Sequence, residues 1–258
     1  MGRLDDRVAL ITGADSGIGQ ATAVAFAEEG ADVVVNYLRD EAGARSTAEQ
    51  VEAAGGRALV VQADVGDEAA VRAMFERAVA TLGRIDILMN NAGVDAAGTF
   101  VADIELGDCE ASLRTNLLGP LLCCKHFVRH RRADGGGGKV INVTSVHEEI
   151  ARAGAADYDC AKGALRNLTR TLALEVAEDG ISVNNIAPGM VLTPFNQEAI
   201  DDPEARKEQV ASIPMKRGAE PREIGRLAVF LASSDGDYVT GSTYVMDGGL
   251  MQNQGQGA

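Results

Sequence analysis

The sequence of 258 residues has no tryptophan, only four tyrosines and only three histidines. It also has no run of about 18 apolar residues, which a membrane-spanning helix would need, and no N-terminal basic segment followed by an apolar stretch, which a secretion signal would need. Its four cysteines are too few for a disulfide framework in a chain of this length and form no CxxC pair. We therefore expect a cytoplasmic protein with free thiols.

Positive charge is also in short supply, with 24 basic residues against 38 acidic ones and a formal net charge of −14. A surface of this sign repels polyanions. We therefore expect neither nucleic acid nor anionic membranes as partners. A small-molecule substrate fits the composition better.

Short β-branched runs alternate with longer alanine-rich stretches of helical period, a pattern typical of βαβ units and a parallel sheet. The runs predict strands at 8–12, 32–37, 58–63, 85–90, 139–144, 182–187 and 243–246. The stretches predict helices at 18–29, 42–54, 68–82, 111–132, 156–178 and 222–232. No linker divides the chain, so we expect residues 1–258 to form a single α/β domain, a Rossmann-type doubly wound parallel sheet of about seven strands with helices on both faces.

The segment 193–217 departs from this alternation. An insertion after the sixth strand lies beyond the C-terminal ends of the strands, where open parallel sheets bind their ligands. We interpret it as a substrate lid. An inert surface excursion is the alternative.

A glycine-rich turn follows the first predicted strand and leads directly into a helix. Its glycines have the spacing G-x-x-x-G-x-G, which differs from the G-x-G-x-x-G dinucleotide fingerprint. Glycine lets the backbone turn tightly and approach a ligand, and the first N–H groups of a helix attract phosphate. A tight turn without a ligand is the alternative to a dinucleotide site, which would consist of Gly13, Asp15, Ser16, Gly17, Ile18 and Gly19.

The choice between the two nicotinamide dinucleotides is expected at the end of the second strand, where an acidic residue would bind the adenosine ribose hydroxyls. This chain has Asn36, Tyr37 and Arg39 there. A neutral residue followed by an arginine tolerates a 2′-phosphate and can bind it, although Asp15 and Asp40 act in the opposite direction. We expect NADP(H) to be favoured, with NAD(H) or dual use left open.

Tyr158 and Lys162 are spaced i, i+4 in a predicted helix, so their side chains share one face. A tyrosine has a pKa of about 10, and a neighbouring cation lowers it toward the range useful for proton transfer. This spacing also occurs by chance. Ser145 strengthens the interpretation because it ends the fifth predicted strand, at the edge of the sheet where ligands bind.

Together these parts resemble the short-chain dehydrogenase/reductase family. The resemblance extends in order through nearly the whole chain, and its motifs are Thr12-Gly-x-x-x-Gly-Ile-Gly19, Asn90-Asn91-Ala92-Gly93, Asn116, Ser145, Tyr158-x-x-x-Lys162, Pro188-Gly189, Tyr238-Val239-Thr240-Gly241 and Asp247-Gly248-Gly249. Thr144 stands where many relatives have a serine, which keeps a hydroxyl group at this position.

The resemblance implies a catalytic set of four residues. Tyr158 would be the general acid/base, Ser145 would hydrogen-bond the reacting oxygen, Lys162 would hold the nicotinamide ribose and lower the Tyr158 pKa, and Asn116 would position a water. The resemblance also implies a homotetramer and further cofactor contacts at Asp64, Val65, Asn91, Ala92, Gly93, Tyr158, Lys162, Pro188, Gly189, Val191 and Thr193.

Three local features resemble bacterial glucose 1-dehydrogenases within this family: the stretch 145–148, the stretch 193–196 and the acidic residue after NNAG. Sugar recognition needs several hydrogen-bonding groups, which Asp95, His147 and Asn196 would supply beside Ser145 and Tyr158. Reduction of a 3-oxoacyl carrier-protein substrate or a small ketone is the alternative. A regulator that binds cofactor without turnover and a structural oligomer are further alternatives, which the intact catalytic set argues against.

Two further features have plain interpretations. His126 and His130 form an i, i+4 pair with no carboxylate or thiol close in sequence, so we expect no metal. Asp157 and Asp159 flank Tyr158 and are expected to point away from its face, with a small effect on its pKa.

Overall fold

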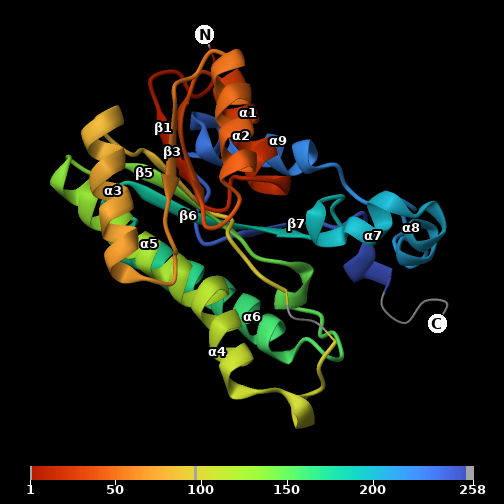
Figure 1. Cartoon of the computed structure of the whole chain (residues 1–258). Coiled ribbons are helices and arrows are strands. Elements are labelled where there is room, and N and C mark those ends of the chain that lie inside the picture. The colour runs from red at the N-terminus through yellow and green to blue at the C-terminus, as the bar shows by residue number, and fades with distance from the viewer. Residues whose placement is uncertain (1, 96–97, 254–258) are drawn as a thin grey trace.

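Seven parallel strands form one sheet in the order β3-β2-β1-β4-β5-β6-β7 (Figure 1). The computed structural model describes residues 2–95 and 98–253. The strands are β1 Val8–Ile11, β2 Asp32–Tyr37, β3 Ala58–Gln62, β4 Ile87–Asn90, β5 Gly138–Val143, β6 Ile181–Pro188 and β7 Thr243–Met246. All seven predicted strands are confirmed, with ends that differ by two residues at most. The order reverses between β1 and β4, which is where such sheets bind ligands.

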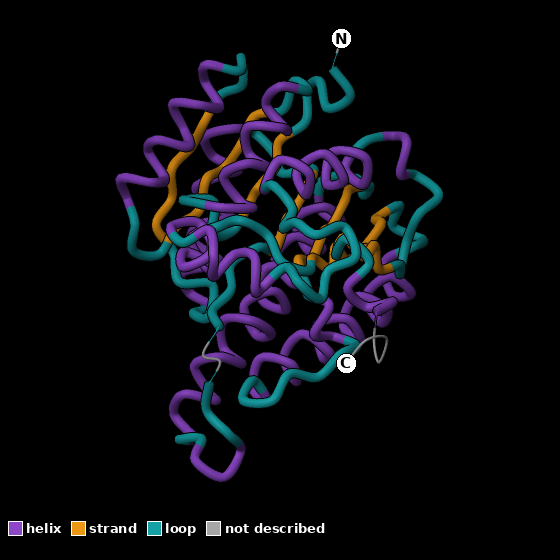
Figure 2. The backbone as a smooth tube through the Cα atoms, turned by 90° about the vertical axis from the view of Figure 1, so that its right-hand side faces the viewer, coloured by secondary structure: helices purple, strands orange, loops and turns teal. Residues whose placement is uncertain are grey.

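Helices cover both faces of the sheet, as predicted (Figure 1). One hydrophobic cluster joins the sheet to α1, α2 and α9, and a second joins it to α3, α5 and α6. Figure 2 shows the strands side by side between these layers, with an arm that carries α4 projecting below. The helices are α1 Gly17–Glu28, α2 Glu41–Ala53, α3 Glu68–Leu82, α4 Leu106–Leu113, α5 Gly119–Ala133, α6 Ala156–Val176, α7 Gln197–Asp201, α8 Pro203–Gln209 and α9 Pro221–Ala232.

The single helix predicted at 111–132 is wrong, because this region contains α4, a π-helical turn at Arg114–Leu118 and then α5. Pro120 lies in the first turn of α5 and has no N–H to donate to the carbonyl of Asn116, so a regular α-helical ladder cannot continue through it. The wider turn carries Asn116, which is fully buried.

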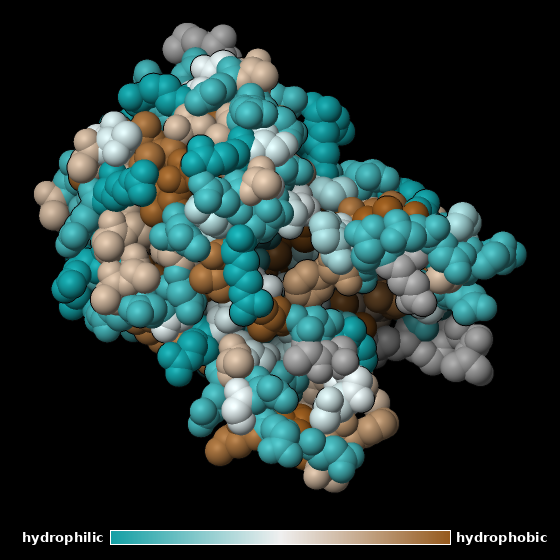
Figure 3. Space-filling view, in the orientation of Figure 1, coloured by the Kyte–Doolittle hydropathy of each residue, from teal (hydrophilic) through white to brown (hydrophobic). Residues whose placement is uncertain are grey.

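The insertion after β6 contains a 3-10 turn at Pro194–Asn196 and the helices α7 and α8. Its two ends are joined where Leu192 N donates to Ala219 O at 2.9 Å and Ala219 N donates to Met190 O at 2.9 Å. The insertion projects from the body at the right of Figure 1, and Figure 3 shows a hollow with hydrophobic residues between the two. The segment therefore lies over the C-terminal edge of the sheet.

In residues 2–95 and 98–253, no helix is long and apolar enough to cross a membrane. Within the same residues, no group of three histidine, cysteine or acidic side chains is arranged to hold a metal ion. Cys123 and Cys124 are buried thiols, and burial raises the pKa of Cys124 to about 12. His130 accepts a hydrogen bond from Ile85 N at 3.1 Å, which makes it part of the packing around α5.

Candidate active site

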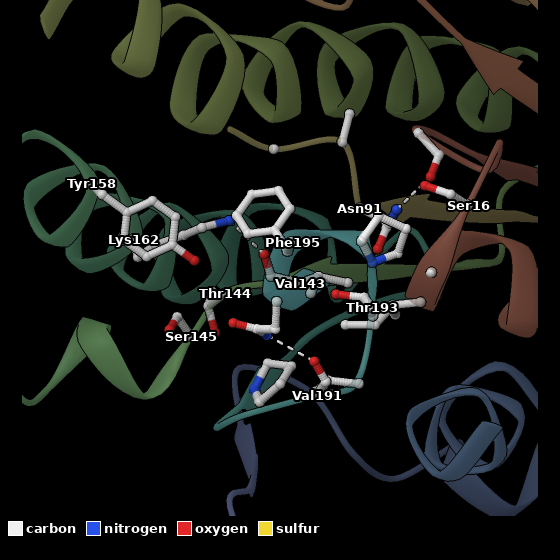
Figure 4. A pocket seen from close by; sticks show the side chains of 18 of the residues that line it. Ser16, Asn91, Val143, Thr144, Ser145, Tyr158, Lys162, Val191, Thr193 and Phe195 are labelled. Atoms are coloured by element: carbon white, nitrogen blue, oxygen red, sulfur yellow. Dashed lines mark hydrogen bonds between the residues drawn. The ribbon is translucent and has the colours of Figure 1, made fainter. Parts of the chain in front are cut away.

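A cavity of about 260 Å³ opens at the C-terminal ends of the central strands. Figure 4 shows Tyr158, Lys162 and Ser145 on one side of it and Ser16, Asn91 and Thr193 on the other. Most of the predicted site residues line it, together with four residues outside the predicted site set: Val143, Thr144, Pro194 and Phe195. The predicted residues that line it are Gly13, Asp15, Ser16, Gly17, Ile18, Asn91, Ala92, Gly93, Ser145, Tyr158, Lys162, Pro188, Gly189, Val191, Thr193 and Asn196.

The glycine-rich turn brings the start of α1 to the cavity. Gly13 and Gly17 have φ values of 58° and 55°, which favour glycine. A Cβ on Gly13 would lie 2.9 Å from Ala92 Cα, and one on Gly17 would lie 3.1 Å from Thr193. Ser16 precedes the helix without a side-chain capping bond, so backbone N–H groups of the first turn remain for a ligand. This donor set fits the pyrophosphate of a dinucleotide.

The segment after β4 is fixed beside this turn. Asn91 Nδ2 donates to Gly13 O at 2.7 Å and to Thr12 O at 3.0 Å, while Thr12 Oγ1 accepts from Asn91 N and Ala92 N, both at 3.0 Å. Gly19 does not line the cavity, and a Cβ there would lie 2.2 Å from Gly13 O. The role of Gly19 is therefore close packing of the helix on the turn.

Asn36 and Tyr37, predicted to contact the cofactor, do not line the cavity. Asn36 is 1% exposed, and its side chain links the glycine-rich turn to the end of β3. Its Oδ1 accepts from Gly13 N at 3.3 Å, and its Nδ2 donates to Ala63 O at 3.1 Å. Tyr37 is buried at the end of β2, whereas Arg39 is exposed. Asn36 therefore supports the turn from beneath, and Arg39 is the accessible group of the three.

The other predicted adenosine contacts also have partners within the protein. Asp64 Oδ1 accepts from Gly66 N at 2.8 Å, and Val65 is buried against Gly119. Asp15 lines the cavity, and burial, followed by the nearby charge of Asp40, raises its pKa.

Helix α6 carries the tyrosine and lysine and is fixed to the sheet by a buried hydrogen bond, in which Thr169 Oγ1 accepts from Asn142 of β5 at 2.7 Å. Lys162 Nζ donates to Val143 O at 3.0 Å and lies 5.4 Å from the Tyr158 ring centroid. Ser145 follows β5 beside them, as Figure 4 shows. The three side chains that the sequence associates with proton transfer are therefore brought together.

The pKa of Tyr158 differs from the expectation, and the pKa of Lys162 is also shifted. Burial raises the pKa of Tyr158 to about 12, although hydrogen bonding to Ser145 and the positive charge of Arg152 act to lower it. Burial lowers the pKa of Lys162 to about 8. The prediction that Lys162 brings the tyrosine below its ordinary pKa is therefore wrong for the protein alone, because desolvation outweighs the favourable charges.

Asn116 lies behind Gly93, close to Lys162. Its Nδ2 donates to Val94 O at 2.9 Å and its Oδ1 accepts from Val94 N at 3.2 Å. A Cβ on Gly93 would lie 2.9 Å from Asn116 Oδ1 and 3.7 Å from Lys162 Nζ. The side chain therefore fixes the segment after β4, and its positioning of a water remains a prediction.

Three of the five predicted substrate contacts, His147, Asn196 and Asp95, are bonded to other parts of the protein. His147 Nδ1 is 3.0 Å from Ile150 O, and Asn196 Nδ2 donates to Val191 O at 2.7 Å. Asp95 forms an ion pair with Arg152. His147 nevertheless lies edge-on to the Tyr158 ring, with centroids 6.3 Å apart, and Asn196 lines the cavity.

The first turn of α6 and the loop before it hold charged residues whose positions were not predicted. Asp159 accepts from Arg152 N at 2.7 Å, and its charge is among those that raise the Tyr158 pKa, so it acts on the site through this loop. Asp157 is buried. Glu148, beside Ser145, is buried with its Oε1 3.3 Å from Arg166 Nε. The only signal for these residues in the sequence was the presence of charged residues close to Tyr158.

Comparison with known proteins is decisive for the family. Residues 13–251 match the family described as enoyl-(acyl carrier protein) reductase. The chain belongs to the short-chain dehydrogenase/reductase family. The predicted family, the predicted fold and an oxidoreductase activity with a nicotinamide dinucleotide are therefore confirmed.

Members of this family that resemble the chain differ in their substrates. The glucose 1-dehydrogenase of Gluconobacter oxydans is 39% identical, over 96% of this chain and 93% of that protein. The 3beta-hydroxysteroid dehydrogenase 1 of Eggerthella lenta is 40% identical, over 96% and 94%. The gluconate 5-dehydrogenase of Burkholderia cenocepacia, solved in complex with NADP and tartrate, has a TM-score of 0.89 and 38% identity, with 97% of each chain covered.

Proposed function

We propose that this short-chain dehydrogenase/reductase is an aldose 1-dehydrogenase, which oxidises the hydroxyl group at C1 of a sugar such as glucose. The observation that carries the proposal is the polar rim around Tyr158, which Ser145, His147 and the Asp95–Arg152 pair form. Such groups suit a substrate with several hydroxyl groups. Similarity to glucose 1-dehydrogenases over nearly the whole chain adds support.

In this proposal Tyr158 carries out the proton transfer and Ser145 assists it. A bound nicotinamide would supply or accept the hydride, and in its oxidised form it would carry a positive charge. Ser145 donates a hydrogen bond to the reacting oxygen, and the Tyr158 phenolate takes the proton from the substrate hydroxyl as the hydride leaves its carbon. In the reverse direction the Tyr158 hydroxyl gives the proton back.

Lys162 acts on this proton transfer through position and charge. Its hydrogen bond to Val143 O holds the ammonium group 5.4 Å from the Tyr158 ring. A cation there stabilises the phenolate. The same ammonium lies in the cavity wall, so we propose that it also binds the nicotinamide ribose.

Reduction of a 3-oxoacyl carrier-protein substrate or a small ketone is the second candidate. The observation in its favour is the apolar surface of the insertion, where Phe195 is 57% exposed and Met215 is 67% exposed. The Phe195 ring reaches over the cavity in Figure 4. An acyl chain could lie on such a surface, whereas a sugar gains less from it.

We propose that NADP(H) is the preferred cofactor because Arg39 is exposed at the end of β2. A guanidinium group makes charge-assisted hydrogen bonds to a phosphate, and NAD(H) has no phosphate at this position. Arg39→Ala is therefore expected to raise the KM for NADP about tenfold and to change that for NAD less than about twofold. Steady-state kinetics with both cofactors measures this.

Arg45→Ala is the matched control, since Arg45 is also exposed at this end of the molecule but pairs with Glu41 of its own helix. It should leave both KM values unchanged. Equal increases of both KM values in Arg39→Ala would reject Arg39 as a phosphate ligand.

The proposed activity is tested by following absorbance at 340 nm while NADP or NAD is paired with aldoses and polyols, and NADPH or NADH with 3-oxo esters and small ketones. We expect the highest kcat/KM for an aldose with NADP. A highest value for a 3-oxo ester would replace the proposal with the second candidate, and no turnover of any substrate would favour a cofactor-binding regulator.

We further propose a homotetramer in the cytoplasm, made of single-domain subunits in which residues 193–217 serve as the substrate lid. The support for an interface is that four large leucines are exposed on α4, α5, α6 and the π-helical turn before α5. They are Leu106, Leu118, Leu121 and Leu174.

A further inference from the structure

Arg152 lies beside Tyr158, in the loop between Ser145 and α6, and is not among the residues that line the cavity. Its guanidinium carbon is 5.9 Å from the Tyr158 ring centroid. Its backbone N donates to Asp159 Oδ2 at 2.7 Å, which ties the loop to the first turn of α6. The arginine is therefore placed by the same helix that carries the tyrosine.

Asp95 holds the guanidinium group from the segment after β4. Arg152 Nη2 donates to Asp95 Oδ1 at 2.9 Å and to Oδ2 at 2.8 Å. The two side chains are 38% and 22% exposed, so the pair is partly screened from water. This ion pair joins the two segments that border the reacting tyrosine.

The guanidinium group of Arg152 has N–H donors that make no hydrogen bond to the described residues. Arginine carries five N–H groups, and only Nη2 has an acceptor among the residues that the structure describes. Nε is buried and without an acceptor there, and Nη1 makes no hydrogen bond to another described residue. Nε is too buried for a ligand to reach, whereas Nη1 belongs to a side chain that is 38% exposed, so Nη1 is the donor left for an oxygen atom of a substrate.

We propose that Arg152, held by Asp95, determines specificity by donating a hydrogen bond to an oxygen on the carbon next to the reacting carbon. The inference rests on the proposed function, since it requires chemistry beside Tyr158. The favoured substrates are aldoses, 1,2-diols and α-hydroxy ketones. Because Asp95 balances the positive charge, the pair suits a hydroxyl or carbonyl oxygen better than a free carboxylate.

The pair also acts on proton transfer. The positive charge of Arg152 lowers the pKa of Tyr158, and the negative charge of Asp95 raises it. In the direction of substrate oxidation the phenolate is the active form, so Arg152→Met should move the ascending, acidic limb of the kcat/KM profile to higher pH, and Asp95→Asn should move it to lower pH. A loop that is merely loosened would move both in the same direction or not at all.

The direct test compares D-glucose with 2-deoxy-D-glucose, which share the reacting carbon and differ only in the neighbouring oxygen. We expect Arg152→Met to lower kcat/KM for glucose about 30-fold and for 2-deoxyglucose less than about threefold. Arg152→Lys should restore the pH profile more fully than the discrimination, because it keeps the charge without the planar donor geometry. Arg132→Met is the matched control, since Arg132 pairs with Asp179 outside the site.

Butane-2,3-diol and butan-2-ol form a second pair that separates this inference from the proposed function. If glucose is not a substrate but Arg152→Met selectively slows the diol, the aldose assignment fails and the role of Arg152 stands. Equal losses for both members of a pair, in a variant with the wild-type melting temperature, would overturn the role of Arg152. Failure of the wild-type enzyme on all four compounds would overturn both.

Discussion

Tyr158→Phe is expected to lower kcat/KM about 10³-fold while the dissociation constant for the cofactor stays within about twofold of the wild-type value. The change removes one hydroxyl group and keeps the ring, so the cavity wall contributed by Tyr158 is preserved. Only the group that we propose exchanges a proton with the substrate oxygen is lost. Turnover is measured at 340 nm, and cofactor binding is measured by titration calorimetry.

Tyr238→Phe is the control for this variant, since Tyr238 is fully exposed and remote from the cavity. It should retain wild-type kcat/KM. If Tyr158→Phe also retained its turnover, Tyr158 could not be the proton carrier. If it lost cofactor binding in parallel with turnover, its role would be binding rather than proton transfer.

Lys162→Met is expected to abolish turnover and at the same time to stabilise the protein without cofactor by about 1–3 kcal/mol at pH 7. Lys162 is 4% exposed, and its burial disfavours the charged form. Methionine has a similar length and no charge to desolvate, although the hydrogen bond to Val143 O is lost. Urea unfolding of both proteins measures the difference.

The difference in unfolding free energy between the wild type and Lys162→Met should depend on pH, and this dependence is an independent test of the desolvated lysine. The Lys162 pKa falls from 10.5 to about 8 on folding, so the unfolded chain binds more protons between these values and wild-type stability rises with pH across that window. Above pH 10.5 the lysine is neutral in both states. The advantage of Lys162→Met should therefore shrink from pH 8 to pH 10.5. An advantage that is constant with pH, or a variant less stable at pH 7, would contradict a desolvated lysine.

Most of the fold could be predicted because a buried parallel sheet leaves a strong periodic signal. Strands β2 and β7 were predicted to the residue, and α3 likewise. The break between α4 and α5 was not predicted, since it depends on how Pro120 and Asn116 meet the rest of the chain. Helical periodicity alone continues through this break.

Some residues of the candidate site could likewise be predicted from the sequence, and others could not. Gly13, Ser145 and Tyr158 were predicted, because backbone geometry and strand ends can be read locally. Asn36 was misjudged, since its bonds to Gly13 and to β3 arise only when distant segments meet. The Tyr158 pKa was expected to fall and instead rises, because burial is a property of the folded state rather than of i, i+4 spacing.

In the proposed reaction a hydride moves from C1 of an aldose to the nicotinamide while Tyr158 takes the proton. The most direct measurement uses D-glucose with deuterium at C1 and NADP, with the product cofactor examined by proton NMR. We predict one deuterium at C4 of the NADPH formed, and none when Tyr158→Phe replaces the enzyme over the same time. Deuterium released to water, or NADPH formed without the label, would contradict the account.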